Sequence, residues 1–319
     1  MAMTREAEMA LLAAGAYWDI REGNNRYDKN IRDTGNQAPI PEGWRVLYGE
    51  ESHSGENVKW FGSGFSARAY RKGNEIVISY AGTETDDKGF FGFNHGSAQD
   101  FFRANFQLAV GAYSAQAYQA ALFYQKIKNT NPGAKITFTG HSLGGGLASL
   151  MAVWFNQKAY VFAPAPFQSS ADRTQTNHDL LKYLLGTPVI QTVKEKLGNN
   201  IDAEFARYDP ERDFAVRKYN VKAWAVKGEV LEGSYLGDLG IGGAPDDLNN
   251  ILAGIFFPPR MGLANVNSIE GHRTSLLKDV GKAISATDKH SIDLHAAALL
   301  VPEFERQLNK TPRCARIDV

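Results

Sequence analysis

Apolar runs rich in β-branched residues mark the predicted strands of this chain. EIVISYAG (75–82) stays apolar over most of its length, as expected for a strand that is buried on both faces of a sheet. Shorter strands are predicted within WRVLYG (44–49) and KWFGSGFSARAYRKG (59–73). Three further runs predict buried strands of the first kind: KITFTG (135–140), AYVFAPAPF (159–167) and VKAWAV (221–226).

Segments with helical spacing of apolar residues lie between and before these strands. One covers 101–129 and is stopped by Asn131-Pro132-Gly133, and HSLGGGLASLMAVWF (141–155) predicts another. An amphipathic helix is also predicted over 4–20 and is followed by a polar loop. Buried strands that alternate with helices predict an α/β protein with a mostly parallel central sheet and helices on both faces.

Two segments are longer than ordinary connections between helices and strands. The first, about 168–220, is mainly helical in pattern, and the second, about 232–275, contains the apolar run ILAGIFFPPRMGL. Long insertions in a compact domain often form lids or binding elements. We therefore expect a single domain over 1–319 with two lid-like insertions.

Composition narrows the class of protein. Lys and Arg together number 35, as do Asp and Glu, so the net charge gives no reason to expect a nucleic-acid partner. A lone cysteine excludes an intramolecular disulfide and a zinc site built on thiolates. Acidic residues before the first apolar run do not fit a secretory signal, and no apolar run reaches the roughly 18 residues of a membrane span. The expected location is cytoplasmic, and secretion without a signal peptide is compatible with the sequence.

The segment Gly140-His141-Ser142-Leu143-Gly144 carries the strongest chemical signal. It has the form G-x-S-x-G and stands between a predicted buried strand and a predicted helix, which is the setting of the nucleophile elbow in α/β-hydrolases. Glycines suit a sharp turn between packed elements, and the helix N-terminus points free N–H groups at the reacting centre. The sequence therefore predicts an α/β-hydrolase fold in which Ser142 is the nucleophile and the Leu143 N–H is one oxyanion donor.

The other members of the triad follow the serine along the chain, in the order acid and then histidine. Glu229 comes directly after the strand predicted at 221–226 and is the expected acid, with Asp238 as the alternative. Three histidines remain downstream of it. His290 lies just before the last predicted helix and is the expected base, His295 lies inside that helix, and His272 is the third candidate.

Several segments together resemble the class 3 lipase family, which includes bacterial enzymes of the phospholipase A1 type. KITFTGHSLGGGLASL (135–150) resembles the family's nucleophile segment, and IVISYAGTETDD (76–87) is similar to its strand ending in R-G-T. Asp100-Phe101 with Asn105 and Gly111 resembles its D-W…N…G stretch. The chain departs from the family in lacking the arginine before Gly82 and in having Ala163-Pro164-Ala165-Pro166 where the family has G-x-P-R.

The resemblance implies a serine-dependent hydrolase of lipid esters, a lipase or phospholipase A1, that works through an acyl-enzyme without a cofactor or metal. It also implies that Thr83 supplies the second oxyanion donor. Two apolar stretches, Phe90–Phe93 and 251–263, suit an acyl groove or transient contact with a membrane surface. The acidic run 84–87 lacks the ligand spacing of a calcium loop and is expected to be solvated.

Three alternatives stay open at this stage. The first is an esterase for soluble short-chain esters. The second is a lipolytic effector or toxin that is exported without a signal peptide. The third is a binding module that keeps the fold without turnover, although the intact G-x-S-x-G segment disfavours it. The sequence indicates no protein partner.

Overall fold

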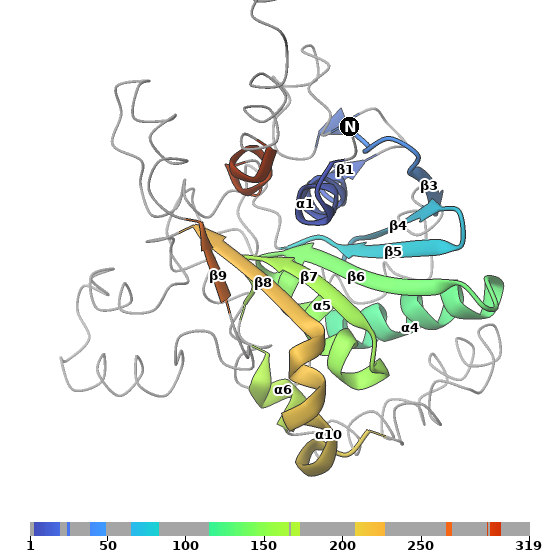
Figure 1. Cartoon of the computed structure of the whole chain (residues 1–319). Coiled ribbons are helices and arrows are strands. Elements are labelled where there is room, and N and C mark those ends of the chain that lie inside the picture. The colour runs from blue at the N-terminus through green and yellow to red at the C-terminus, as the bar shows by residue number, and fades with distance from the viewer. Residues whose placement is uncertain are drawn as a thin grey trace, which may run out of the picture.

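The computed structural model of this chain is shown in Figure 1. It describes residues 3–19, 24–25, 39–48, 65–82, 115–165, 167–172, 208–226, 266–269, 292 and 294–300.

A mixed sheet forms the centre of the described structure (Figure 1). Its strands lie side by side in the order in which they occur along the chain. The first two pairings, β3–β4 and β4–β5, are antiparallel, and every pairing from β5 to β9 is parallel. The prediction of a mostly parallel α/β sheet is therefore confirmed. The strands are β3 (Arg45–Tyr48), β4 (Ala67–Lys72), β5 (Glu75–Tyr80), β6 (Lys135–His141), β7 (Lys158–Phe162), β8 (Val221–Val226) and β9 (Val266–Ile269).

Helices cover both faces of this sheet. The helix α1 lies on one face, and α4 and α5 lie on the other (Figure 1). Thr4 caps the start of α1, where its side chain accepts a hydrogen bond from the Ala7 N–H. The described helices are α1 (Arg5–Gly15), α4 (Ala115–Thr130), α5 (Leu143–Phe155), α6 (Gln168–Asp172), α10 (Pro210–Arg217) and the 3-10 helix η3 (Lys218–Asn220).

The alternation of side chains along each strand gives the sheet two hydrophobic cores. Ile76 and Ile78 of β5 pack with α4 and α5, whereas Val77 between them packs with α1. All three are fully buried. Apolar residues of the segment 294–300 also contribute to the core on the α1 side. The central strands are thus buried on both faces, which explains why they read as continuous apolar runs.

Three details differ from the sequence prediction. The helix predicted over 4–20 ends at Gly15, and Trp18–Asp19 forms the strand β1, which pairs with β2 (Asn24–Asn25) in the region predicted as loop. The predicted insertion 232–275 contains β9, which extends the parallel sheet beside β8. The run VNSI of β9 is short and half polar, so its sequence does not show the apolar pattern of a buried strand. It belongs to the sheet because it pairs with β8.

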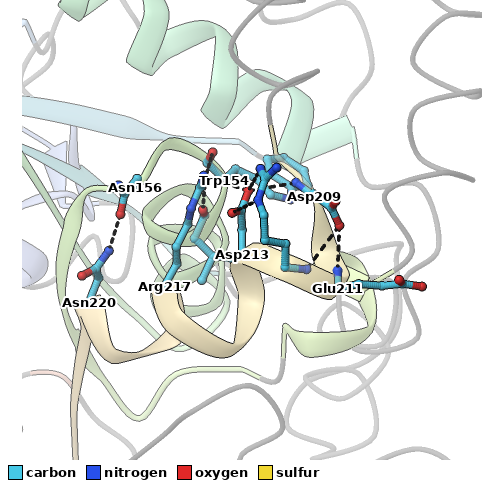
Figure 2. Close-up of polar contacts among 9 residues, drawn as sticks. Trp154, Asn156, Asp209, Glu211, Asp213, Arg217 and Asn220 are labelled. Carbon is cyan, nitrogen blue, oxygen red and sulfur yellow. Dashed lines mark hydrogen bonds and ion pairs between the residues drawn. The ribbon is translucent and has the colours of Figure 1, made fainter.

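A polar contact holds α10 against the C-terminal end of α5 (Figure 2). Arg217 donates hydrogen bonds to the carbonyl oxygens of Val153 and Trp154, at 3.1 and 3.0 Å, and to Asp213 at 2.8 Å. A cation at this position satisfies carbonyl groups that have no partner inside α5 and complements the negative end of the helix dipole. The contact therefore fixes the helix whose other end carries the candidate nucleophile.

In the described ranges, no helix is both long enough and apolar enough to cross a membrane.

Candidate active site

Ser142 occupies the single position between β6 and α5. Its backbone angles are φ 57° and ψ −128°, which lie outside the regions that a residue with a side chain ordinarily adopts. The Ser142 N–H donates to the Phe162 carbonyl at 3.0 Å, and its own carbonyl accepts from the Gly146 and Ala165 N–H groups at 3.0 and 2.9 Å. Neighbouring elements therefore hold the serine in a strained conformation, as is common at reactive centres.

The glycines on either side of the serine have no room for a side chain. A Cβ atom on Gly140 would overlap the Gly144 carbonyl, and one on Gly144 would overlap the Tyr80 carbonyl oxygen. These neighbours are backbone atoms of α5 and of the end of β5, which cannot move independently of the fold. The G-x-S-x-G pattern is thus a steric requirement of this strand–turn–helix junction.

The serine hydroxyl lies beside the positive end of α5. Ser142 is 2% exposed, and its Oγ has no hydrogen-bond partner among the described residues. Leu143 is the first residue of α5, so its N–H has no acceptor within the helix. A buried hydroxyl without a partner next to unbonded N–H groups is a place where negative charge can be stabilised.

The end of β5 packs directly against this turn. A Cβ atom placed on Gly82 would lie 3.0 Å from the His141 carbonyl oxygen and 3.2 Å from the Ser142 Cβ. Gly82 immediately precedes Thr83, the residue expected to supply the second oxyanion donor. Thr83 itself lies outside the described residues, as do Phe90–Phe93 and the acidic run 84–87.

A tyrosine from the end of α1 reaches the same place. The Tyr17 hydroxyl lies 2.9 Å from His141 Nδ1, and it accepts a hydrogen bond from the Gly82 N–H at 2.9 Å. The sequence prediction treated Tyr17 only as part of an amphipathic helix. The available signal was a tyrosine at the end of an apolar run, since a buried tyrosine hydroxyl ordinarily has a polar partner.

Among the candidates for the acid and the base, His295 is the one that lies within the described residues. It is fully buried, and its Nε2 accepts a hydrogen bond from the N–H of Val226, the last residue of β8, at 3.3 Å. Its ring centre lies 5.9 Å from that of His141. The other candidates, His272, His290, Glu229 and Asp238, lie outside the described residues.

The described part of the chain contains no group of three or more His, Cys, Asp or Glu side chains that could hold a metal ion.

This chain is similar to a family of phospholipase domains and to a fungal lipase. Residues 8–179 match the family model described as a Tle-like phospholipase domain. The matched range contains the strands β3 to β7 and the whole turn around Ser142. Among solved structures, a lipase from Rhizopus microsporus var. chinensis matches at 16% sequence identity with a TM-score of 0.27. That match covers 50% of this chain and 56% of the fungal lipase, so it spans about half the length of each.

Proposed function

The chain belongs to the family of Tle-like phospholipase domains, and from this premise we propose that it hydrolyses carboxylic esters of phospholipids with Ser142 as the nucleophile. The observation that carries the proposal is the strained, buried Ser142 at the junction of β6 and α5. Its Oγ has no hydrogen-bond partner among the described residues and stands beside the N-terminus of α5. This strand–turn–helix junction has the form of the nucleophile elbow of α/β-hydrolases, in which the serine lies beside a helix N-terminus.

The proposed reaction proceeds in two steps. His290 removes the proton from Ser142 Oγ as the oxygen attacks the ester carbonyl carbon, and the negative charge on the carbonyl oxygen is stabilised by the Leu143 and Thr83 N–H groups. The tetrahedral intermediate then collapses, and the lysolipid leaves as an alcohol with the proton from His290. Water, deprotonated by His290, attacks the acyl-enzyme and releases the fatty acid. Glu229 stabilises the imidazolium in both steps.

The position of His295 supports the proposal that His290 is the base and Glu229 the acid. The bond from the Val226 N–H brings the helical segment after His290 to the end of β8. Glu229 follows Val226 after only two intervening residues, and His290 lies five positions before His295, whose ring centre is 5.9 Å from that of His141. This closeness in sequence to two residues that meet near the turn at Ser142 supports the proposed pair. The Nε2 of His295 accepts a hydrogen bond from the backbone of β8, which favours a structural role for His295. We propose His290 as the base, with His272 as the remaining alternative.

Membership of the family supports hydrolysis of lipid esters. Within that class of substrate, we propose phospholipids. A phospholipase acts on substrate at a lipid–water interface, so we propose transient contact with the membrane surface through the two apolar stretches Phe90–Phe93 and 251–263. The proposed reaction needs no cofactor or metal. Hydrolysis of soluble short-chain esters is the competing activity.

The first experiment combines active-site labelling with lipid hydrolysis. The wild type and Ser142→Ala are treated with a fluorophosphonate probe and, in parallel, assayed on phosphatidylcholine vesicles, emulsified triglyceride and soluble short-chain esters. Ser149→Ala is the matched control, because Ser149 is a buried serine of α5 whose hydroxyl donates to the Gly145 carbonyl at 2.8 Å. Labelling and phospholipid hydrolysis should disappear in Ser142→Ala alone. A wild type that labels but cleaves only short soluble esters would overturn the phospholipase proposal and retain the serine mechanism.

Variants of the proposed triad and oxyanion donor extend this test. His290→Ala and Glu229→Gln should each lower kcat strongly without changing the free energy of unfolding, and Thr83→Val should lower kcat by roughly 10²–10³. His295→Ala should instead destabilise the fold, because it leaves the buried Val226 N–H without its acceptor, and should retain turnover per folded molecule. Near-normal turnover of His290→Ala would show that the base is one of the other two histidines.

A further inference from the structure

The hydroxyl of Tyr17 joins three chain segments that are far apart in sequence. It accepts from the Gly82 N–H at 2.9 Å, lies 2.9 Å from His141 Nδ1, and donates to the His141 carbonyl oxygen at 3.3 Å. Tyr17 is 3% exposed and His141 is 6% exposed. Bulk water therefore does not compete for these hydrogen bonds, and each is stronger than it would be on the surface.

A count of hydrogens shows which contacts the hydroxyl makes in each tautomer of His141. A tyrosine hydroxyl has one hydrogen to donate and two lone pairs that can accept. The Gly82 N–H takes one lone pair of the hydroxyl oxygen. The hydroxyl hydrogen goes to His141 Nδ1 when that nitrogen carries no hydrogen, and to the His141 carbonyl when Nδ1 itself donates. In either tautomer the hydroxyl is bonded both to the end of β5 and to the residue before Ser142.

These contacts fix the spacing between the two halves of the proposed oxyanion hole. His141 is bonded covalently to Ser142, and Gly82 is bonded covalently to Thr83. A Cβ atom on Gly82 would lie 2.5 Å from the Tyr17 hydroxyl and 3.2 Å from the Ser142 Cβ, so the hydroxyl, Gly82 and the serine are packed against one another. A shift of Gly82 would move the Thr83 N–H relative to the Leu143 N–H.

We propose that Tyr17 is a positioning residue for catalysis, whose hydroxyl holds the end of β5 against the turn at Ser142 and so sets the distance between the two oxyanion donors. The inference rests on the proposed ester hydrolysis by Ser142. The residue does not touch the substrate, and it acts through Gly82 and His141. Since a misplacement of about 1 Å in an active site can cost about 10²-fold in rate, loss of the hydroxyl should be felt in kcat.

The test compares Tyr17→Phe with Tyr80→Phe. Both variants remove one buried tyrosine hydroxyl and keep the ring. The Tyr80 hydroxyl donates to the Ala120 carbonyl of α4 at 3.0 Å, away from the turn, so its loss reports the structural cost alone. For each protein, kcat and KM on phospholipid and on a soluble ester, the affinity of an alkylboronic acid, and thermal stability are measured. The boronic acid forms a tetrahedral adduct on the serine and needs the oxyanion donors in place.

Tyr17→Phe is expected to lower kcat by about 10- to 100-fold with KM changed less than about twofold, and to weaken boronic acid binding by a similar factor. Tyr80→Phe should keep wild-type kcat and boronic acid affinity at a comparable loss of thermal stability. Wild-type kcat in Tyr17→Phe, or equal losses of kcat in both variants, would overturn the positioning role.

Hydrogen exchange separates a failure of this inference from a failure of the proposed function. The Gly82 amide should exchange faster in Tyr17→Phe than in the wild type and in Tyr80→Phe, and this readout needs no catalysis. Unchanged exchange at Gly82 would overturn the positioning role even if the enzyme hydrolyses phospholipid. A wild type that neither labels at Ser142 nor cleaves an ester would instead overturn the proposed function, and the catalytic role of Tyr17 with it.

Discussion

At Gly144 the turn around Ser142 leaves no space for even one methyl group. A Cβ atom there would overlap the Tyr80 carbonyl oxygen and lie 2.7 Å from the carbonyl carbon of Ala81. Both atoms belong to the backbone where β5 ends. An added methyl must therefore separate α5 from β5, and with them the two proposed sources of oxyanion donors.

Gly144→Ala is expected to lower both stability and turnover. Overpacking of this kind costs about 1–3 kcal/mol, and the shift should reduce kcat/KM per folded molecule at least tenfold. Gly73→Ala is the control. Gly73 has φ +60°, and a Cβ atom added there would meet no other atom within 4 Å, so this variant should lose about 1 kcal/mol through backbone strain without loss of kcat/KM. Chemical denaturation and ester kinetics measure both quantities. Wild-type kcat/KM in Gly144→Ala would show that the two elements can separate without consequence for the site.

At the level of the element, α5 is fixed at both ends by different means. Its N-terminus is held by the backbone bonds of Ser142, and its C-terminus is held by Arg217, which bonds to Val153, Trp154 and Asp213 (Figure 2). The pKa of Asp213 is lowered to about 2, mainly by the hydrogen bonds from the Arg212 side chain. Burial opposes the shift, and the Asp209 N–H and the charges of Arg217 and Arg212 add to it.

This pKa predicts a loss of stability in acid. The carboxyl of Asp213 titrates near 3.8 when unfolded and near 2 when folded, so the unfolded chain binds the proton more readily. The contribution of Asp213 is fully present above about pH 4 and is lost as the pH falls towards 2. The side chain of Arg212 is largely exposed, so solvent weakens its interaction with Asp213. We therefore expect the Asp213 carboxylate to contribute about 1–2 kcal/mol to the free energy of unfolding. Between pH 5 and pH 2.5, the free energy of unfolding measured in urea should fall less in Asp213→Asn than in the wild type, by most of this amount, because pH 2.5 still lies above the folded pKa. An equal loss in both proteins would exclude the carboxylate as its source.

At the level of the whole molecule, the sheet couples two hydrophobic cores. Leu12 of α1 is 1% exposed in one core, and Leu150 of α5 is fully buried in the other. The strand β5 supplies side chains to both, with Val77 on the α1 side and Ile76 and Ile78 on the other. The two cores cannot separate without dividing a strand, so we expect them to unfold together.

Leu12→Ala and Leu150→Ala should each lower the free energy of unfolding by about 2–5 kcal/mol. Both should shift the same single transition, measured by tryptophan fluorescence and by circular dichroism. Leu12→Ala carries a second expectation. Since the helix before Tyr17 is loosened without removal of its hydroxyl, turnover per folded molecule should fall less than in Tyr17→Phe. Two separate transitions would show that the cores belong to independently folding units, against the predicted single domain over 1–319.

The central strands and the turn at Ser142 could be predicted from the sequence because their causes are local. A strand buried on both faces must be apolar along its whole length, and β5, β6, β7 and β8 are found at the predicted runs. The glycines around Ser142 are required by contacts within one strand–turn–helix junction and at its border with β5. The weaker pattern of β9 was missed because its pairing with β8, rather than its composition, places it in the sheet.

The amino-acid sequence by itself determined the α/β class, the strands on either side of the site and the position of Ser142, because periodicity and steric demands within a short segment leave a direct mark on residue type. Tertiary structure alone decided which polar groups meet there. Tyr17 and His141 are 124 positions apart, and no feature of the sequence around Tyr17 predicts which polar group its hydroxyl will contact. The same holds for His295 and Val226. Such contacts arise when α1 and residues 294–300 pack on one face of the sheet and place their buried polar atoms against strand ends that offer hydrogen bonds.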